Sequence, residues 1–133
     1  MDIKRDFYLN RLINARQNHL VKVVTGPRRC GKTFLLTNLF LKYLESEGVA
    51  FDHIILISME DRRNRNLSNP DVLLDYIDEY SKDGGLYYII IDEVQMIDEF
   101  TDVLNTLLLR PNFDIYVTGT AVPLKSADFK IID

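Results

Sequence analysis

A glycine-rich stretch that follows an apolar run constrains this chain more than any other feature. The stretch TGPRRCGKT, residues 25–33, comes after apolar residues 20–24 and before residues 34–47, whose apolar positions recur at helical spacing. A strand, a glycine loop that ends in Gly-Lys-Thr, and a helix form the context of a phosphate-binding loop. By ordinary residue frequencies, G-x-x-x-x-G-K-[ST] arises by chance in roughly one chain of this length in a few hundred. The sequence therefore predicts a nucleotide site rather than a ligand-free glycine turn.

The residue types in this loop suit phosphate binding. Gly26 and Gly31 have no Cβ, so the backbone can come close to a phosphate. The loop N–H groups then form an anion nest, supported by the positive end of the following helix. We expect Lys32 to reach the β- and γ-phosphates of ATP and the Thr33 hydroxyl to hold Mg²⁺. The residues expected to contact the nucleotide are Gly26, Pro27, Arg28, Arg29, Cys30, Gly31, Lys32, Thr33 and Phe34.

Length and composition limit the class of protein. A chain of 133 residues with 47% hydrophobic residues can form one domain with a packed core, so we expect a single domain over residues 1–133. No apolar run reaches membrane-spanning length, and the N-terminus lacks the apolar core of a signal peptide. A single cysteine, Cys30, excludes an internal disulfide. These features predict a cytoplasmic protein with no membrane partner.

The charge distribution leaves a nucleic-acid partner open but does not indicate one. The net charge is −4, which argues against a chain that grips nucleic acid over its whole surface. Eight of the sixteen Lys and Arg residues lie within residues 1–33, and three of them belong to the loop itself. A solvated helix face explains the other five better than a nucleic-acid or acidic-partner patch. Arg62, Arg63 and Arg65 are likewise better explained as solvated charges than as a binding surface.

The remaining periodicity predicts alternating strands and helices. Strands are expected at residues 20–24, 53–57, 86–91 and 113–117, and helices at 6–17, 34–47, from Pro70 to about 80, and 99–109, with Asp6 and Asp98 as N-caps. Residues 59–69 are polar and are expected to form a long loop. This succession predicts an α/β fold with a parallel sheet and helices on both faces. Ligands bind at the carboxyl ends of such strands, where the loop, Asp92-Glu93 and residues 118–120 all lie.

An apolar strand that ends in Asp-Glu is the Walker B pattern. Asp92 is expected to hold Mg²⁺ through water, because this ion keeps much of its hydration shell. Glu93 can polarise a water for attack on the γ-phosphate. We therefore interpret Glu93 and Lys32 as catalytic, together with Thr118 and Thr120, and Thr33 and Asp92 as the metal site.

Three segments resemble a known family. GPRRCGKT at 26–33, IDEVQ at 91–95 and DIYVTG at 114–119 are similar to the AAA-type ATPase domain of bacterial and archaeal proteins, which is often fused to a C-terminal DUF4143 region. The resemblance covers about residues 4–119. It implies ATP binding and hydrolysis on a three-layer P-loop fold with strand order 5-1-4-3-2, with Gln95 near Glu93.

The chain departs from this family in two places. Thr120-Ala121 replaces the usual Ser-Asn after Thr-Gly, which leaves Thr118 or Thr120 as the sensor of the γ-phosphate. The chain ends at Asp133, before the region in which the family's arginine finger and fifth strand normally lie. We therefore expect the C-terminal part of the fold to be missing and one side of the 20–24 strand to be open, unless residues 129–132 or another chain pair with it.

Three functions fit these features. The first is an ATPase that hydrolyses Mg-ATP, with a partner protein or a second copy of the chain completing the site. The second is a nucleotide-dependent binding module with little hydrolysis, because its sensor and arginine-finger regions are altered or absent. The third, a small-molecule kinase, is disfavoured because no arginine-bearing lid or acceptor pocket is evident in the sequence.

Overall fold

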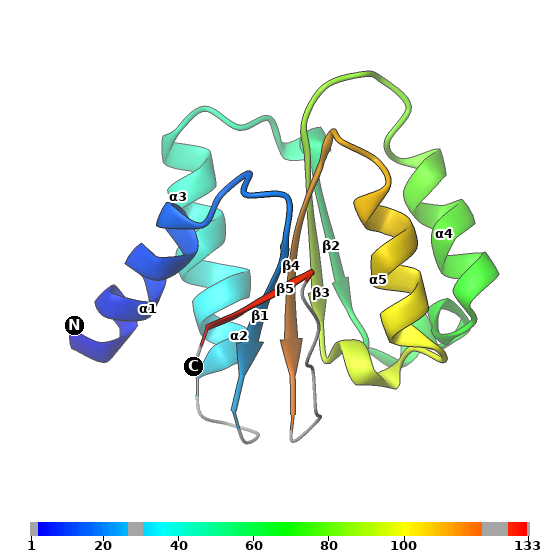
Figure 1. The fold of residues 1–133 in the computed structure, drawn as a ribbon, viewed down its shortest axis with the longest axis horizontal. Helices are drawn as coiled ribbons and strands as arrows, with labels where there is room; N and C mark the ends of the chain where they lie inside the picture. The colour runs from blue at the N-terminus through cyan, green and yellow to red at the C-terminus, as the bar shows by residue number, and fades with distance from the viewer. Residues whose placement is uncertain (1–2, 27–30, 121–127, 133) are drawn as a thin grey trace.

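Five parallel strands form one sheet at the centre of the molecule. The computed structural model describes residues 3–26, 31–120 and 128–132. The strands lie side by side in the order β2-β3-β4-β1-β5, and every neighbouring pair is parallel (Figure 1). This is the order that the family resemblance implies. The strand bounds are Val21–Thr25 for β1, Ile54–Ser58 for β2, Tyr87–Asp92 for β3, Phe113–Gly119 for β4 and Phe129–Ile132 for β5.

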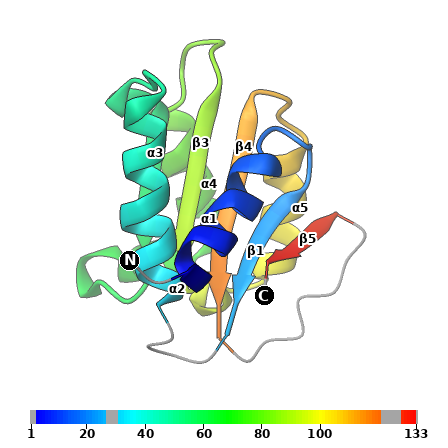
Figure 2. The same ribbon diagram turned by 90° about the vertical axis from the view of Figure 1, so that its left-hand side faces the viewer.

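Helices cover both faces of the sheet, as predicted. Figures 1 and 2 show α1 and α3 on one face and α4 and α5 on the other. The helix between β1 and β2 is continuous but contains a wide π-helical segment, η1. The helical bounds are Ile3–Asn14 for α1, Lys32–Phe34 for α2, Leu35–Phe40 for η1, Leu41–Ser46 for α3, Phe51–His53 for η2, Arg62–Ser68 for η3, Pro70–Glu79 for α4, Val94–Met96 for η4 and Phe100–Leu108 for α5. None of the helices in the described ranges is long and apolar enough to cross a bilayer.

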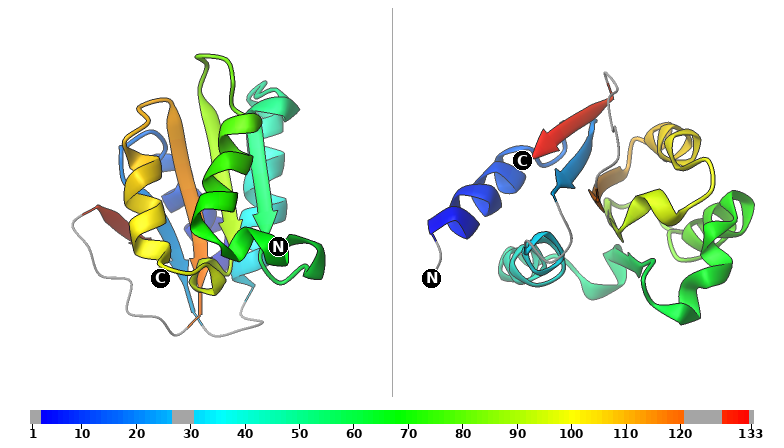
Figure 3. Two further views of the ribbon diagram at one scale, coloured as in Figure 1. Left: turned by 90° about the vertical axis from the view of Figure 1, so that its right-hand side faces the viewer. Right: turned by 90° about the horizontal axis from the view of Figure 1, so that it is seen from below.

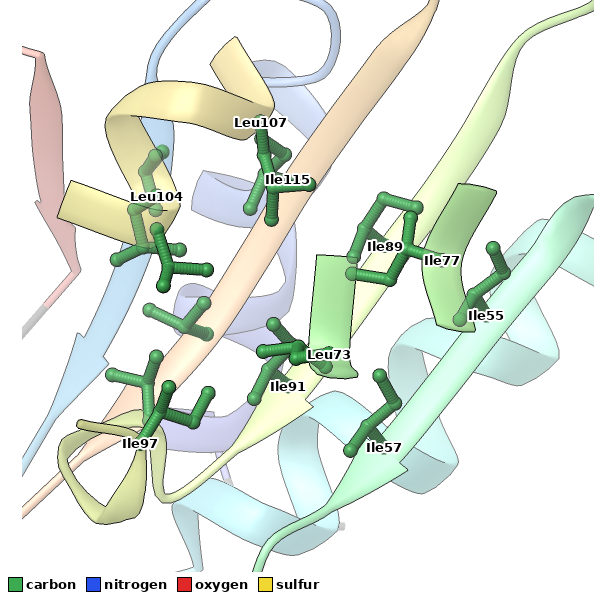
Figure 4. Close-up of a cluster of buried hydrophobic side chains, with 14 of the residues drawn as sticks. Ile55, Ile57, Leu73, Ile77, Ile89, Ile91, Ile97, Leu104, Leu107 and Ile115 are labelled. Atoms are coloured by element: carbon green, nitrogen blue, oxygen red, sulfur yellow. The ribbon is translucent and has the colours of Figure 1, made fainter. Parts of the chain in front are cut away.

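Two apolar clusters, one on each face, hold the three layers together. Alternate strand residues point to opposite faces, so Ile89 and Ile91 enter one cluster and Tyr88 and Ile90 the other. The first cluster lies under α4 and α5, and its buried members include Ile55, Ile57, Leu73, Ile77, Leu104 and Leu107 (Figure 4). The second lies under α1 and α3 and includes Leu12, Leu36, Phe40, Leu44 and Tyr116. The three-layer α/β fold is therefore confirmed.

The fifth strand corrects one expectation. We expected the sequence to stop before this strand, leaving β1 open on one side. Instead, β5 pairs with β1 from Val21↔Phe129 to Val24↔Ile132. Phe129 and Ile132 are both buried, Phe129 in the cluster under α4 and α5 and Ile132 in the cluster under α1 and α3. Of the two alternatives, the chain's own tail fills the edge.

Several helix and strand boundaries also differ from the sequence prediction. α1 begins at Ile3, so Asp6 lies in its first turn and is not the N-cap. The N-cap of α5 is Glu99, in the left-handed conformation, rather than Asp98. Residues 62–68 of the expected loop form η3, because Leu67 is buried in the core. β2 lies at the edge of the sheet, and Leu56 on it is therefore 42% exposed.

A buried charged cluster ties β1 to β4 on the α1 side of the sheet. Lys22 Nζ lies 2.5 Å from Asp114 Oδ1, and both side chains are almost fully buried. The second carboxylate oxygen of Asp114 accepts hydrogen bonds from the Tyr116 hydroxyl at 2.6 Å and from the backbone N–H of Gln17 at 3.0 Å. Burial lowers the pKa of Lys22, and the Asp114 charge opposes that effect. The carboxylate therefore fixes the register of two strands and the turn that precedes β1.

Removal of this carboxylate should destabilise the fold strongly. We predict that Asp114→Ala lowers the free energy of unfolding by about 3–5 kcal/mol, because it leaves the Lys22 ammonium buried without its counter-ion. Chemical denaturation monitored by circular dichroism measures the change. Asp102→Ala, at an exposed position of α5, is the control and should lie within about 0.5 kcal/mol of wild type. Equal stability of the two variants would contradict the role given to Asp114.

Candidate functional site

The predicted site segments meet at one edge of the sheet. Because β4 lies between β1 and β3, the carboxyl ends of all three strands are adjacent, with Thr25 opposite Gly119 and Ile91 opposite Val117. In Figure 1 this is the lower edge of the sheet, toward which the strand arrows point. Figure 3 shows the same edge from below. Topology alone therefore brings the glycine loop, Asp92-Glu93 and residues 118–120 together.

The two glycines of the loop adopt backbone conformations that favour glycine. Gly26 has φ 148° and Gly31 has φ 93°, both positive. Gly31 leads directly into α2, whose first residue is Lys32. Pro27, Arg28, Arg29 and Cys30 were also predicted to contact the nucleotide, and they lie outside the described residues. Phe34 is 40% exposed at the start of the helix.

Two contacts join the glycine loop to the end of β3. Lys32 Nζ lies 3.0 Å from Glu93 Oε1, and the side chains are 3% and 1% exposed. The Thr33 hydroxyl donates a hydrogen bond of 2.9 Å to Asp92 Oδ1. The lysine and the threonine thus each face one of the two acidic residues of the Asp-Glu pair.

Thr118 connects the ends of β3 and β4. Its hydroxyl donates to Asp92 Oδ1 at 2.6 Å and accepts from the backbone N–H of Glu93 at 2.7 Å. The side chain is fully buried. Thr118 therefore holds both acidic residues in place through one hydroxyl group.

The Glu93 carboxylate is held on several sides. The Thr120 hydroxyl lies 2.7 and 2.8 Å from its two oxygens, and Gln95 Nε2 donates to Oε2 at 2.5 Å. The proximity of Gln95 to Glu93 was predicted. Burial opposes ionisation of Glu93, but the hydrogen bonds from Thr120, Gln95 and Lys32 outweigh it and lower the pKa of this carboxyl. Glu93 is therefore a carboxylate at neutral pH.

The backbone at Glu93 is unusual. Its φ and ψ are both 59°, in the left-handed region that residues other than glycine rarely adopt. Such conformations cost of the order of 1–3 kcal/mol and persist where the surroundings hold them. Here the surroundings are the Thr118 hydroxyl, which accepts from the Glu93 backbone N–H, and the side chains of Thr120 and Gln95, which donate to the Glu93 carboxylate. This backbone conformation turns the chain sharply after Asp92 and directs the Glu93 side chain toward Lys32.

A cavity of about 490 Å³ opens beside this cluster. The described residues that line it are Gly31, Lys32, Thr33, Phe34, Thr37, Asn38, Glu60 and Glu93. Among the described residues, Asp92, Thr118 and Thr120 do not line the cavity; they contact the lining residues Thr33 and Glu93 instead.

Sequence reasoning missed three of the lining residues. Thr37 lies one helical turn after Thr33, so its place on the same helix face could have been predicted from the i, i+4 spacing. Asn38 is the next residue on that helix. Glu60 follows the end of β2 as Glu93 follows the end of β3, so its position at the same edge of the sheet could also have been predicted.

Other polar residues lie away from the cavity. His53 contacts Asp52 and Asp83 at 2.9 and 2.8 Å and stacks on Tyr87, near the opposite ends of the strands. Arg63 pairs with Asp61 at 2.8 Å. Arg110 pairs with Asp78 at 3.2 Å.

A five-stranded parallel sheet with a glycine loop at the start of a helix is the architecture of P-loop nucleoside triphosphatases. A family model described as an AAA domain matches residues 18–130, and the chain belongs to this family. Membership supports an ATPase-like domain that binds nucleotide.

Curated relatives share this region of sequence. An uncharacterized protein of Haemophilus influenzae is 29% identical over 127 residues, which cover 95% of this chain and 32% of the relative. One from Methanocaldococcus jannaschii is 28% identical over 130 residues, covering 95% of this chain and 26% of the relative. The RNA editing associated helicase 2 of Trypanosoma brucei is 29% identical over 110 residues, covering 80% of this chain and 5% of the relative. The chain therefore spans about a third or less of the length of these relatives.

Solved structures share the fold. C. elegans PCH-2 superposes with a TM-score of 0.59 at 16% identity, over 96% of this chain and 41% of that one. The structure of Drosophila ORC bound to DNA superposes with a TM-score of 0.57 at 12% identity, over 98% of this chain and 89% of that one. At these low sequence identities, the similarity shows a shared fold alone.

The Thr120 hydroxyl should stabilise the fold through Glu93. We predict that Thr120→Val lowers the free energy of unfolding by about 1 kcal/mol at neutral pH, since it removes a hydrogen bond to a buried carboxylate. The pKa of folded Glu93 is lowered, so its contribution exists above the unfolded pKa and is lost as the pH falls. The difference should therefore shrink below about pH 4. Chemical denaturation at several pH values measures this difference in unfolding free energy between wild type and variant, with Thr101→Val, at an exposed position, as the control. A difference that does not change with pH and equals that of the control would contradict the role given to Thr120.

His53 should make stability depend on pH in the opposite direction. Hydrogen bonds to Asp52 and Asp83 raise the pKa of His53 in the folded protein, although partial burial opposes them. A histidine whose pKa is raised on folding stabilises the fold at pH values below its pKa in the unfolded chain, which is about 6.5. This stabilisation is lost as the pH rises from there through the pKa of the folded protein. We predict that His53→Phe, which retains a ring against Tyr87, abolishes this decline. Asp52→Asn should reduce it, and an unchanged pH profile in both variants would refute the assignment.

Proposed function

We propose that residues 1–133 form a single ATPase domain that binds Mg-ATP and hydrolyses it to ADP and phosphate. The ion pair between Lys32 and Glu93 at the edge of the sheet is the observation that carries this proposal. It brings the lysine of a phosphate-binding loop to the carboxylate that follows a buried Asp. Family membership supports nucleotide binding; hydrolysis is the additional step proposed here.

Lys32 is the proposed phosphate ligand. It lies at the first position of α2, directly after Gly31, and lines the cavity. A nucleotide phosphate is a stronger partner for an ammonium than a single carboxylate, because it offers more acceptor oxygens and more negative charge. ATP therefore competes with Glu93 for Lys32. The competition transfers the lysine to the phosphate and leaves the Glu93 carboxylate beside the cavity.

The residues around Thr33 fit a magnesium ion. The Thr33 hydroxyl and Asp92 Oδ1 are oxygen donors only 2.9 Å apart, and Mg²⁺ prefers oxygen ligands from one or two protein groups together with water and phosphate. No cluster of three or more potential metal-binding His, Cys, Asp or Glu side chains occurs among the residues that the structure describes. A Mg²⁺ ion that shares its coordination with phosphate does not require such a cluster. When bound, the ion would neutralise charge on the phosphates.

Glu93 is the proposed base. Its pKa is lowered, so it is ionised and can accept a proton from water at neutral pH. Thr120 and Gln95 hold its two oxygens and so orient the carboxylate once Lys32 has moved to phosphate. Thr118 acts indirectly, by holding Asp92 and the Glu93 backbone.

A second function is favoured by one observation. Both Glu93 oxygens accept hydrogen bonds, which restrain the carboxylate from approaching a water. If nucleotide binding does not release the Glu93 carboxylate from these hydrogen bonds, the domain acts as a nucleotide-dependent binding module with little hydrolysis. In either case we propose that a second copy or a partner protein completes the site with an arginine.

Paired variants separate binding from hydrolysis. We predict that Lys32→Ala weakens Mg-ATP binding by about tenfold to a hundredfold, since it removes charge-assisted contacts to phosphate. Glu93→Gln should still bind Mg-ATP while its turnover falls by about a hundredfold or more. Calorimetry and phosphate release measure the two properties, with exposed Lys42→Ala as the control.

The outcomes distinguish the two functions. Turnover by wild type that is lost in Glu93→Gln supports the ATPase. Binding by wild type without phosphate release supports the binding module. Equal binding by wild type and Lys32→Ala would overturn both proposals.

A further inference from the structure

A groove along the free edge of β2 carries apolar side chains that the nucleotide site does not use. β2 is the last strand of the sheet and pairs with β3 alone among the described strands. Phe51, Leu56 and Tyr80 line the groove and are 86%, 42% and 56% exposed. Three large apolar side chains exposed at one place are unusual for a free surface.

The groove has walls from both faces of the sheet. Leu41 of α3 lies on one side, and Tyr76 of α4 and Tyr80, which caps its C-terminus, lie on the other. The β2 residues Ile54 to Leu56 form the floor, and the volume is about 860 Å³. Figures 1 and 3 show β2 between the two helices at this end of the sheet. The groove lies at the amino-terminal half of β2, whereas the nucleotide cavity lies at the carboxyl ends of the strands.

The rim of the groove is acidic. Asp52, Glu79 and Asp83 lie on it, against one lysine, Lys82. The side chains of Asp52 and Asp83 are 83% and 56% exposed, so their charges face solvent. His53 lies between these two carboxylates and, when protonated, offsets one charge; the rim remains negative in either state. An incoming chain of positive charge is therefore favoured.

We propose that this groove binds an extended segment of a partner protein in which apolar residues alternate with lysine or arginine. The segment would add a strand to β2, because an edge strand has backbone N–H and C=O groups free for pairing. Alternate side chains of a strand point to opposite sides. Its apolar residues therefore point to the α3 face, where Leu56 lies. Its basic residues point to the α4 face and reach Glu79 and Asp83, which line the groove beside Tyr80.

The same charges argue against a second copy of this chain in the groove. If two β2 strands paired edge to edge around a two-fold axis centred on the groove, the two acidic rims would be brought close together. Like charges brought together across an interface cost free energy. A basic partner has no such cost.

Synthetic peptides test this proposal directly. One fluorescein-labelled peptide alternates valine with lysine, and a second of equal length alternates valine with glutamate. We expect the lysine peptide to bind at least about tenfold more tightly in low salt and to weaken as salt is added. In amide NMR spectra of the protein, the shifts it causes should map to residues 54–58 and 76–83. Methylation of alternate backbone nitrogens of the peptide should abolish binding, since it removes the strand hydrogen bonds.

Matched variants connect the binding to the groove. Phe51→Ser should weaken the lysine peptide by about tenfold, whereas Leu109→Ser, which removes an equally exposed apolar side chain at the end of α5, should not. Glu79→Gln should reduce both affinity and its salt dependence, with exposed Glu45→Gln as control. Equal binding of the two peptides, unchanged binding by Phe51→Ser, or shifts that map elsewhere would overturn the proposal. Self-association of the protein that Phe51→Ser abolishes would assign the groove to a second copy and overturn it too.

Discussion

The ion pair between Lys32 and Glu93 is the contact on which the candidate site depends. It joins the start of the helix after β1 to the turn after β3, two segments that are not neighbours in the sheet, because β4 lies between those strands. A buried pair of this kind is maintained only when both charges have additional partners. Thr120 and Gln95 supply them on the glutamate side. The strained backbone at Glu93 is tolerated for the same reason.

β4 has a central role that its apolar sequence does not suggest. Toward its amino-terminal end, Asp114 holds Lys22 of β1. At its carboxyl end, Thr118 holds Asp92 of β3 and the backbone of Glu93. One strand thus fixes the position of both its neighbours through buried polar contacts. Such contacts tolerate small displacements less than apolar packing does, so they set the relative height of the three strand ends at which the site forms.

The sequence was sufficient to predict the fold and the meeting of the main site segments. Apolar runs of strand length, separated by helical periodicity, indicated a parallel sheet, and the carboxyl ends of its strands indicated the site edge. Helix caps were less predictable: Asp98 matches the usual N-cap preference, but Glu99 occupies the position in a left-handed conformation. The exposure of Leu56 on β2 could not be predicted, because apolarity cannot distinguish a central strand from an edge strand with an exposed groove. The partners of the Glu93 carboxylate could be predicted only in part, since side-chain hydrogen bonds depend on distances that spacing does not encode.

The place of β1 in the sheet has a consequence for how the chain folds during synthesis. β1 is made first of the five strands, yet its two neighbours, β4 and β5, are made last. Until they appear, β1 is an apolar strand with neither side paired. Contacts so distant in sequence form slowly, because a long loop must close before they contribute. The nascent chain therefore exposes an aggregation-prone strand through most of its translation, and protection of β1 falls to the cell's chaperones rather than to the sheet itself.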